Sequence, residues 1–495
     1  MKISKIFPHL KLDNRLNNLI IKDINDDSRL VKEGSLFFIR ERKNFDIFSV
    51  LRSIESKTVV FVGDIKHKDM LESIIKYKPF IFVRNVEKEF LKAVNLFYEF
   101  KESGLKFIAI TGTNGKTTTA SLIYYLLKKM GKNPSLISTA RYLVGRKEYK
   151  ADYTTPDFLT LRKILKKAKD AGSNFIIMEV SSHAISQKRI EGIEFIRCVF
   201  TNLSQDHLDY HRTMNSYFNV KKKLFLDMEF PRSRKGRSRN EEAAALINTD
   251  DKMGKILFKE LSNKLSYGIT SKADFKADNI RFNKQGSCFD LVYAGRHYSV
   301  ASKLYGRYNI LNVLGSLGVV ISLGFSLSKA VKLISGWTAP EGRLERVSKD
   351  IFVDYAHTPD ALGKALDALR QSGYERIICV FGCGGDRDKG KRLIMGKVAS
   401  KIADWTFITS DNPRSEEPLK ICSQIEKGFL GKNYAVAADR KEAIKKAIKM
   451  LKENGPETCL VVAGKGHEDC QIIKGRKIPF KDSRVIKELL KISNT

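Results

Sequence analysis

The chain contains 495 residues, of which 42% are hydrophobic, and this length and composition predict about three globular domains. Its formal net charge of +33 would suit a nucleic-acid-binding protein. The lysines are spread along the whole sequence, however, and the compact basic run at 232–239 has the composition of a solvated loop. Because an acidic small substrate or a general bias toward lysine explains the charge, we expect no nucleic-acid partner.

Signals for export, membrane insertion or disulfide bonding are weak. Residues 1–25 mix Lys, Asp and Asn with scattered apolar residues, which is not the pattern of a signal peptide. The most apolar stretch, 311–325, contains glycine and serine and is too short to span a bilayer, so it predicts a buried helix. The seven cysteines form no metal-type pair. We therefore expect a cytoplasmic monomer with reduced thiols and no membrane partner.

The first part of the chain carries no nucleotide signature. Residues 1–101 alternate short strand-like runs, at 58–62 and 80–83, with helical stretches. This alternation predicts a small N-terminal α/β domain.

A phosphate-binding loop is predicted next. A β-branched apolar run stops at Gly112, and a segment of helical character follows as far as Met130. In such a strand–turn–helix, backbone N–H groups and the positive helix end face the phosphates, a lysine reaches the terminal phosphate and a threonine hydroxyl can hold Mg²⁺. The loop has two residues between its glycines, where the usual pattern has four before Gly-Lys. The predicted ATP-binding residues here are Gly112, Thr113, Asn114, Gly115, Lys116, Thr117 and Thr118.

Residues 102–338 alternate strand and helix patterns, as a parallel-sheet ATPase domain requires. Glu179 and Ser181 stand near the end of one apolar strand, and His207 follows another at 198–201. A carboxylate and an imidazole at neighbouring strand ends suit a divalent cation that bridges nucleotide phosphates. Polar groups that merely satisfy the backbone at strand ends are the alternative.

Beyond residue 338 the pattern repeats. Strands are predicted at 351–353, 377–381, 405–409 and 460–462, each leading into a glycine or polar turn. Ligands of open α/β sheets bind at such carboxyl ends of strands. Residues 339–495 are therefore predicted to form a C-terminal Rossmann-like α/β domain.

Seven motifs in order resemble those of the Mur ligases, ATP-dependent amino-acid ligases that build the peptidoglycan stem peptide. The resemblance implies three α/β domains: 1–101 for the UDP-muramoyl substrate, 102–338 for ATP and 339–495 for the amino acid. Within the family, the chain looks like the branch that adds a diamino acid to the D-glutamate γ-carboxylate of UDP-N-acetylmuramoyl-L-alanyl-D-glutamate. The motifs are 112–117, 153–156, 178–183, 201–211, 306–312, 342–345 and 354–359.

The resemblance implies roles for individual residues. Lys116 would bind the β- and γ-phosphates, and Thr117 and Glu179 would hold one Mg²⁺. His207 would help to hold a second Mg²⁺ with a carbamylated lysine, which by register is Lys221, although Lys222 and Lys223 adjoin it. Lys116, Glu179, His207 and Lys221 are thus the expected catalytic residues. Asn309, Arg343, Asp354 and His357 match positions that hold the nucleotide, and Ser28, Thr154, Thr155, Ser181, Gln187 and Arg189 match positions that bind the muramoyl-dipeptide.

One segment departs from the family pattern. After residue 39 the family usually has a glycine-rich Asp-Gly-His segment, whereas this chain has Arg-Glu-Arg-Lys-Asn-Phe-Asp-Ile-Phe at 40–48. The departure concerns the uridine side of the pocket rather than the chemistry.

The third domain indicates which amino acid is added. Asp-Asn-Pro-Arg resembles the form that accepts meso-diaminopimelate, and lysine-adding relatives lack that arginine. A guanidinium can hold the extra carboxylate of diaminopimelate through two parallel hydrogen bonds. The expected diaminopimelate-binding residues are Arg387, Asp411, Asn412, Pro413, Arg414, Gly464 and Glu468.

The general base for the incoming amine is not identified, and His207 and His211 are candidates. The rival functions are a lysine-adding ligase, a folylpolyglutamate synthetase and a nucleic-acid-associated P-loop ATPase. The residues that match the muramoyl-dipeptide site argue against folate, and Arg414 argues against lysine.

Overall fold

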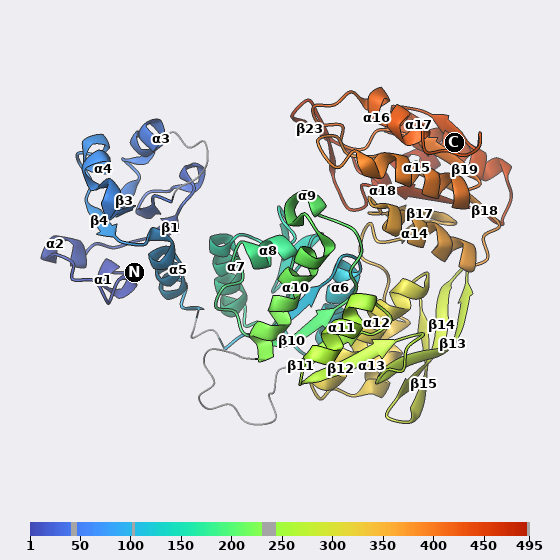
Figure 1. Ribbon diagram of the computed structural model, residues 1–495, viewed down its shortest axis with the longest axis horizontal. Coiled ribbons are helices and arrows are strands. Elements are labelled where there is room, and N and C mark those ends of the chain that lie inside the picture. The colour runs from blue at the N-terminus through green and yellow to red at the C-terminus, as the bar shows by residue number, and fades with distance from the viewer. Residues whose placement is uncertain (41–46, 101–103, 230–243, 493–495) are drawn as a thin grey trace.

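The computed structural model describes residues 1–40, 47–100, 104–229 and 244–492. Three α/β lobes follow one another along the chain, the first beside α7 of the central lobe and the third above α12 (Figure 1). The three-domain α/β class predicted from sequence is confirmed, whereas the exact boundaries at 101 and 338 stay a prediction. The basic run at 232–239 lies outside the described residues.

The first lobe is built on four parallel strands in the order β1-β2-β3-β4. Apolar residues of these strands, among them Leu36, Phe38, Val60 and Val62, are buried against the helices. The strands are β1 Asp23–Asn25, β2 Ser35–Phe38, β3 Thr58–Asp64 and β4 Phe80–Val83. The helices are α1 Ile3–Ile6, α2 Asn14–Asn17, α3 Ile47–Ile54, α4 Lys68–Ile74 and α5 Val86–Phe97, with 3₁₀ turns at Ser28–Leu30 and Ile65–His67.

An eleven-stranded sheet forms the central lobe, in the order β15-β14-β13-β12-β11-β10-β5-β9-β6-β7-β8. Strands β13 to β6 of that order run parallel, and β14, β15, β7 and β8 extend the edges in antiparallel fashion. The strands are β5 Lys106–Thr111, β6 Pro134–Ile137, β7 Arg141–Val144, β8 Lys147–Lys150, β9 Phe175–Glu179, β10 Phe195–Phe200, β11 Ala244–Asn248, β12 Lys264–Gly268, β13 Phe275–Asn283, β14 Gly286–Tyr293 and β15 Arg296–Ser302.

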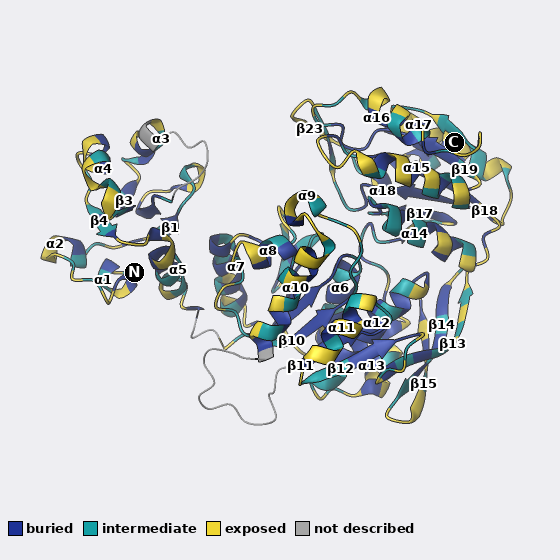
Figure 2. Cartoon of the chain, in the orientation of Figure 1, coloured by how far each residue is buried: buried dark blue, intermediate teal, exposed yellow. Residues whose placement is uncertain are grey.

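Helices cover both faces of this sheet, and their inner sides are buried while their outer sides are exposed (Figure 2). Successive residues of β5 point to opposite faces, so Ile108 and Ile110 join one core and Phe107 and Ala109 the other. The predicted buried helix at 311–325 is α12, whose glycines pack against Tyr267 and Phe275. The helices are α6 Lys116–Lys129, α7 Phe158–Asp170, α8 Ser182–Ser186, α9 Leu208–His211, α10 Met214–Glu229, α11 Lys252–Glu260, α12 Arg307–Ser322 and α13 Leu327–Ile334.

The third lobe holds a six-stranded sheet in the order β16-β17-β21-β18-β19-β20, parallel except for the edge strand β16. A separate hairpin pairs β22 with β23. The strands are β16 Glu345–Ser348, β17 Ile351–Asp354, β18 Arg376–Phe381, β19 Trp405–Ile408, β20 Tyr434–Val436, β21 Thr458–Ala463, β22 Cys470–Ile473 and β23 Arg476–Pro479. The helices are α14 Pro359–Gln371, α15 Gly390–Ile402, α16 Pro418–Glu426, α17 Arg440–Glu453 and α18 Asp482–Ile492.

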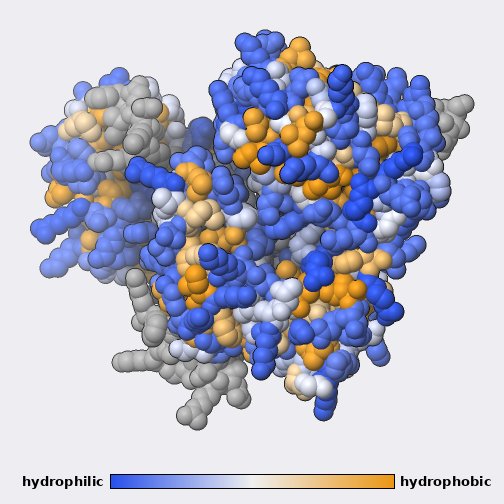
Figure 3. All heavy atoms as spheres, turned by 45° about the vertical axis from the view of Figure 1, so that its right-hand side comes forward, coloured by the Kyte–Doolittle hydropathy of each residue, from blue (hydrophilic) through white to orange (hydrophobic). Residues whose placement is uncertain are grey.

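The surface is mostly hydrophilic on the face shown in Figure 3, with apolar patches separated by polar side chains. Within the described residues, no helix is both long and apolar enough to cross a bilayer. All seven cysteines are free thiols, as the sequence led us to expect.

Candidate functional site

The phosphate loop begins where β5 ends, between the ends of β10 and β9. Gly112 has a φ of 144°, and a Cβ there would lie 1.9 Å from Thr201 Oγ1. Gly115 has a φ of 85°, and its Cβ would lie 2.3 Å from Asn312 Oδ1. Both positions therefore need glycine for conformation and for space. The Asn114 N–H donates to Asn202 Oδ1 at 2.9 Å, which fixes the loop against the end of β10.

Lys116 and Thr117 begin α6 at the base of this loop. Lys116 Nζ folds back and donates to the Gly112 and Thr113 carbonyls at 2.9 and 2.7 Å. Burial lowers the pKa of the Lys116 ammonium, which nearby Glu179 and Asp206 partly restore. Thr117 Oγ1 accepts a 3.0 Å hydrogen bond from Arg343 Nη2 of the third lobe.

Glu179 ends β9 and is fully buried. Its Oε1 accepts from the Thr139 N–H at 2.8 Å, and its Oε2 accepts from Thr139 Oγ1 at 3.0 Å. Thr139 thus holds the carboxylate in one orientation beside the phosphate loop. No sequence pattern marked Thr139, which lies outside every recognised motif, in the bend after β6.

Lys221 is the member of its lysine run that faces the phosphate loop. Its Nζ donates to the Gly112 carbonyl at 3.0 Å and lies 4.7 Å from the centre of the Tyr217 ring. Burial, together with the charge of Lys116, lowers the pKa of Lys221 well below its usual range. Lys222 instead pairs with Glu260, and Lys223 is exposed. Of the three adjacent lysines, the one that the sequence resemblance selected, Lys221, is therefore the buried one.

His207 lies at the start of α9 with a left-handed φ of 53°. Its Nε2 is 3.4 Å from Asp206 Oδ2, and its ring centre is 4.9 Å from that of His183. Partial burial lowers the pKa of His207 to about 4, so the ring is neutral at neutral pH. His211 is the other candidate base, and its Nε2 forms a 2.8 Å hydrogen bond with Ser182 Oγ.

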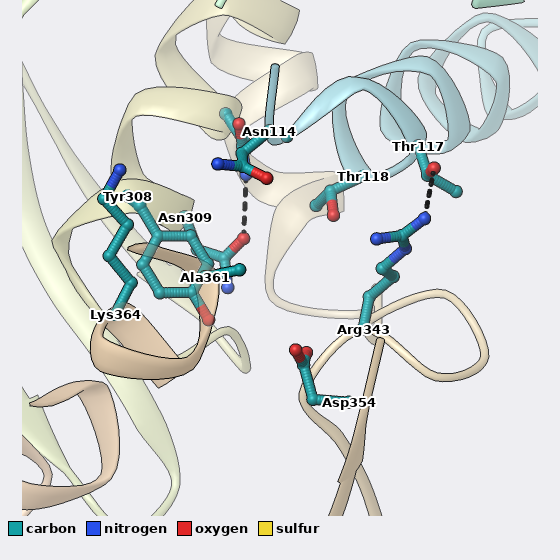
Figure 4. A pocket seen from close by; sticks show the side chains of 11 residues that line it. Asn114, Thr117, Thr118, Tyr308, Asn309, Arg343, Asp354, Ala361 and Lys364 are labelled. Carbon is teal, nitrogen blue, oxygen red and sulfur yellow. Dashed lines mark hydrogen bonds between the residues drawn. The ribbon is translucent and has the colours of Figure 1, made fainter. Parts of the chain in front are cut away.

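A pocket that is partly open to solvent lies between the loop and the third lobe. Figure 4 shows Asn114, Thr117 and Thr118 on one side and Arg343 and Asp354 on the other. The pocket is lined by Asn114, Gly115, Thr117, Thr118, Tyr308, Asn309, Asn312, Arg343, Asp354, Ala361 and Lys364.

The pocket brings together most, but not all, of the predicted nucleotide residues. Gly112, Thr113, Lys116 and His357 are not among its lining residues, and His357 Nδ1 lies 2.8 Å from the Tyr355 carbonyl. Conversely, sequence reasoning missed Tyr308, Asn312 and Lys364. The first two fall inside a recognised motif, whereas Lys364 on α14 carried no signal.

A hydrogen-bonded group gathers five of the six predicted muramoyl-dipeptide residues. Thr155 Oγ1 donates to the Glu179 carbonyl at 2.8 Å and accepts from the Ser181 N–H at 3.1 Å. Arg189 donates from Nη1 to the Thr155 carbonyl at 2.7 Å and from Nε to Gln187 Oε1 at 3.0 Å. Thr154 Oγ1 lies 3.0 Å from Thr139 Oγ1, so this group adjoins Glu179.

The remaining residue, Ser28, lies on the first 3₁₀ turn of the first lobe. Its neighbour Arg29 donates from Nε to Asp27 Oδ1 at 2.9 Å. In the departing segment, residues 41–46 lie outside the described residues. Arg40, which precedes them, donates to Asp26 Oδ2 at 2.5 Å and to Glu87 Oε2 at 2.8 Å.

The predicted amino-acid residues meet where β18, β19 and β21 end. Arg414 Nη1 donates to the Gly385 carbonyl at 2.7 Å. Glu468 Oε2 accepts from Asn412 Nδ2 at 2.7 Å and from Lys465 Nζ at 2.9 Å. A Cβ on Gly464 would lie 2.6 Å from Asp411 Oδ2. Pro413 approaches Gly385 closely, whereas Arg387 is exposed at the edge of the group.

Among the described residues, no three His, Cys, Asp or Glu side chains are close enough to hold a metal ion. The predicted Mg²⁺ residues include only one carboxylate and one imidazole. Mg²⁺ prefers oxygen ligands. These residues therefore fit Mg²⁺ if phosphate oxygens and a carbamylated Lys221 supply the remaining oxygen ligands.

Comparison with known proteins gives one consistent answer. The Mur ligase middle domain matches residues 110–320, and the Mur ligase, glutamate ligase domain matches residues 342–466. A relative from Clostridium botulinum (strain ATCC 19397 / Type A), named UDP-N-acetylmuramoyl-L-alanyl-D-glutamate--2,6-diaminopimelate ligase, is 38% identical over 485 residues, 96% of each chain.

Solved structures share the fold. A structure of a UDP-N-acetylmuramoyl-L-alanyl-D-glutamate--2,6-diaminopimelate ligase is 28% identical with a TM-score of 0.66, and the match covers 100% of this chain and 99% of the other. MurF ligase from Thermotoga maritima, solved in complex with ADP, is 16% identical with a TM-score of 0.64, and the match covers 97% and 99% of the two chains. At that identity the second likeness concerns the fold alone.

Proposed function

Because the chain belongs to the Mur ligase family, we propose that it adds meso-diaminopimelate to the D-glutamate γ-carboxylate of UDP-N-acetylmuramoyl-L-alanyl-D-glutamate. The reaction forms an amide and converts ATP to ADP and phosphate. The observation that carries the choice of amino acid is the position of Arg414, beside Gly385 and Asn412 at the carboxyl ends of β18 and β19. We place the reaction in the cytoplasm and the enzyme in the monomeric state.

ATP is proposed to bind between the phosphate loop and the third lobe. The backbone N–H groups of the loop and the start of α6 face the phosphates, and Lys116 turns from its own loop carbonyls to the terminal phosphate. Arg343 and Asp354 close the pocket from the third lobe. The close approach of Gly112 to Thr201 and of Gly115 to Asn312 supports this placement, because a side chain there would fill the loop.

One Mg²⁺ would be held by Thr117 and Glu179, and a second by His207 and a carbamylated Lys221. When bound, these ions would neutralise phosphate charge as the γ-phosphoryl group moves. Lys221 suits carbamylation because burial favours its neutral amine, which can add CO₂ and become an oxygen ligand. The neutral His207 ring can supply a nitrogen ligand.

The proposed chemistry has two steps. The γ-carboxylate of D-glutamate attacks the γ-phosphate, ADP leaves, and an acyl phosphate forms. The amine of diaminopimelate then attacks the acyl carbon, phosphate leaves and the amine loses a proton. The Thr155, Ser181 and Arg189 group lies beside Glu179, so an acceptor held there would present its carboxylate to the phosphate loop.

Arg414 is proposed to select diaminopimelate over lysine. Its hydrogen bonds to described residues come from Nη1, which leaves Nε and Nη2 for the distal carboxylate of the substrate. A charge-assisted hydrogen bond contributes roughly 1.5–3 kcal/mol. Loss of one such bond corresponds to a drop of about 10- to 150-fold in kcat/KM, so loss of both bonds should cost at least about 10-fold.

The test measures ADP release with the UDP-muramoyl-dipeptide, Mg²⁺ and ATP, and with either meso-diaminopimelate or L-lysine. We expect turnover with diaminopimelate, and a drop of the size above in Arg414→Ala. The control is Arg484→Ala, which changes an exposed arginine on α18. Preference for lysine would contradict the role of Arg414 but leave the ligase reaction standing. Silence with both amino acids would contradict the proposed acceptor.

A further inference from the structure

We propose that the ion pair between Arg392 and Glu416 positions the amino-acid site, although neither residue contacts the substrate. This inference rests on the proposed function, since it concerns the amino acid that the third lobe would bind. Arg392 lies on α15 with its side chain fully buried, so it cannot reach a ligand. It is a positioning residue for Arg414.

The pair links the loop after β18 to the loop after β19. Arg392 Nη1 donates to Glu416 Oε2, and Nη2 donates to Glu416 Oε1, both at 2.8 Å. Nη2 also donates to the Gly384 carbonyl at 3.1 Å, and Nη1 donates to Gln424 Oε1 at 2.6 Å. One guanidinium therefore binds the loop after β18, the loop after β19 and helix α16 together.

Glu416 extends the link on its other side. Its Oε1 also accepts from the Asp386 N–H at 2.7 Å. The hydrogen bonds from Arg392 hold the pKa of Glu416 down to about 2, so the carboxylate stays charged at any working pH. A charged carboxylate can accept from Arg392 and Asp386 at the same time, which a neutral amide cannot do as well.

The two loops then align along their length. Gly385 N–H donates to the Asn412 carbonyl at 2.9 Å, and Ser415 Oγ donates to Asp386 Oδ1 at 2.5 Å. A Cβ on Gly385 would lie 1.9 Å from the Pro413 carbonyl oxygen, so the backbones touch. We call this contact between residues 384–387 and 412–416 the seam, and Arg414 is part of it.

Two residues of the seam have left-handed backbones. Asp386 has a φ of 53° and Arg414 a φ of 52°. For residues other than glycine this conformation costs of order 1 kcal/mol and persists only where the surroundings enforce it. Glu416 is bonded to Asp386 and lies two residues beyond Arg414. Without its charge, both residues can relax, and the Arg414 side chain moves.

A purely structural role predicts different behaviour. Buried ion pairs are weak contributors to stability, and a well-packed apolar pair of similar size often replaces them without loss. Such a pair cannot hold the Asp386 N–H or the Gly384 carbonyl. Stability and substrate binding should therefore separate in the right variants.

The experiment compares Glu416→Gln, Arg392→Lys and the double variant Arg392→Met with Glu416→Leu. The matched control is Glu488→Gln, which alters an exposed ion pair with Arg484 on α18. We expect the KM for the amino acid to rise by about 10- to 100-fold in the Arg392 and Glu416 variants, because misplacement by about 1 Å costs that much. The KM for ATP should stay within about twofold of wild type.

The double variant tells the two roles apart. We expect its melting temperature to match that of wild type while the KM for the amino acid stays raised. An unchanged KM in Glu416→Gln, or a KM that recovers with the melting temperature in the double variant, would overturn the inference. The assay uses whichever amino acid the wild-type enzyme accepts, so a preference for lysine corrects the proposed substrate and still measures the positioning role.

A second readout does not depend on turnover. Hydrogen exchange of peptides that contain 384–387 and 412–416 should be faster in Glu416→Gln than in Glu488→Gln. If the wild-type enzyme uses no amino acid, the proposed function fails while this measurement still tests the ion pair. Equal exchange in the two variants would then overturn the positioning role.

Discussion

Asp354 at the end of β17 offers a quantitative test of burial at the pocket between the phosphate loop and the third lobe. Its carboxylate faces the pocket, and its Oδ2 accepts from the Leu344 N–H at 2.5 Å. Removal from solvent raises the pKa of Asp354 from its usual 3.8 to about 6, against the opposing effect of Arg343. Because the folded pKa is raised, the charged form destabilises the fold, and the penalty builds up between the unfolded pKa of 3.8 and the folded pKa of about 6 and is complete above it.

The magnitude follows from the two pKa values. A shift of this size corresponds to about 3 kcal/mol near pH 7.5 and to about 1 kcal/mol near pH 4.5. The side chain is only partly buried, so these are upper values. Asp354→Asn removes the charge and keeps an oxygen for the Leu344 N–H. An amide has one oxygen where a carboxylate has two, so Asp354→Asn also loses one hydrogen bond from a backbone N–H. That loss costs about 1 kcal/mol at either pH.

The assay is urea unfolding of Asp354→Asn and wild type at both pH values. We expect the variant to gain up to about 2 kcal/mol relative to wild type between pH 4.5 and pH 7.5. Asp367→Asn, an exposed change on α14, serves as the control and should show no such difference. If the stability difference between Asp354→Asn and wild type is the same at both pH values, the burial argument for Asp354 is wrong.

Two further predictions concern the phosphate loop. Lys221→Met should lower Mg²⁺-dependent ADP release by roughly 100-fold, because the proposed oxygen ligand is lost. Lys223→Met, at an exposed position on the same helix, should leave the rate within about twofold of wild type. Equal rates in the two variants would contradict the proposed role of Lys221 as a metal ligand. Gly112→Ala should weaken ADP binding by about 10-fold or more, measured by calorimetry, because its Cβ would lie 1.9 Å from Thr201 Oγ1. Gly131 also has a positive φ, of 78° against 144° at Gly112, but a Cβ there would meet nothing within 4 Å. Unchanged affinity is therefore expected in Gly131→Ala, and a similar loss would implicate backbone strain alone.

Local signals made the phosphate loop predictable. Strand, glycines, Lys116 and helix are contiguous in sequence, so their geometry follows from short-range rules. The lysine run at 221–223 was harder, because three adjacent helical residues point about 100° apart and the sequence does not say which side is covered. Burial against Gly112 and Tyr217 distinguishes Lys221 only once the fold is known.

Contacts between lobes could not be predicted at all. Asn114 Nδ2 donates to Asp360 Oδ2 at 2.9 Å across 246 positions of sequence, and no local pattern marks Asp360 or its neighbour Lys364. The central sheet shows the same limit. The alternation of strands and helices predicted its parallel part, whereas the antiparallel additions β14 and β15 depend on pairing with β13. Recognised motifs led to the proposed amino-acid site, but not to the Arg392 ion pair beside it.

Helix α7 shares its apolar face with the first lobe. Phe158 and Leu159 belong to the hydrophobic core of that lobe, and the Phe158 ring centre lies 6.1 Å from that of Phe90. Arg162, fully buried on the same helix, donates to Asn95 Oδ1 at 2.8 Å.

The first lobe is therefore not a removable module. A chain truncated to begin at residue 104 would expose the apolar side chains of Phe158 and Leu159 and leave the Arg162 guanidinium without its Asn95 partner. It should therefore aggregate rather than fold as a minimal ATPase. During synthesis, residues 1–100 cannot complete their core until α7 has left the ribosome. The first and central lobes should thus unfold as one cooperative unit.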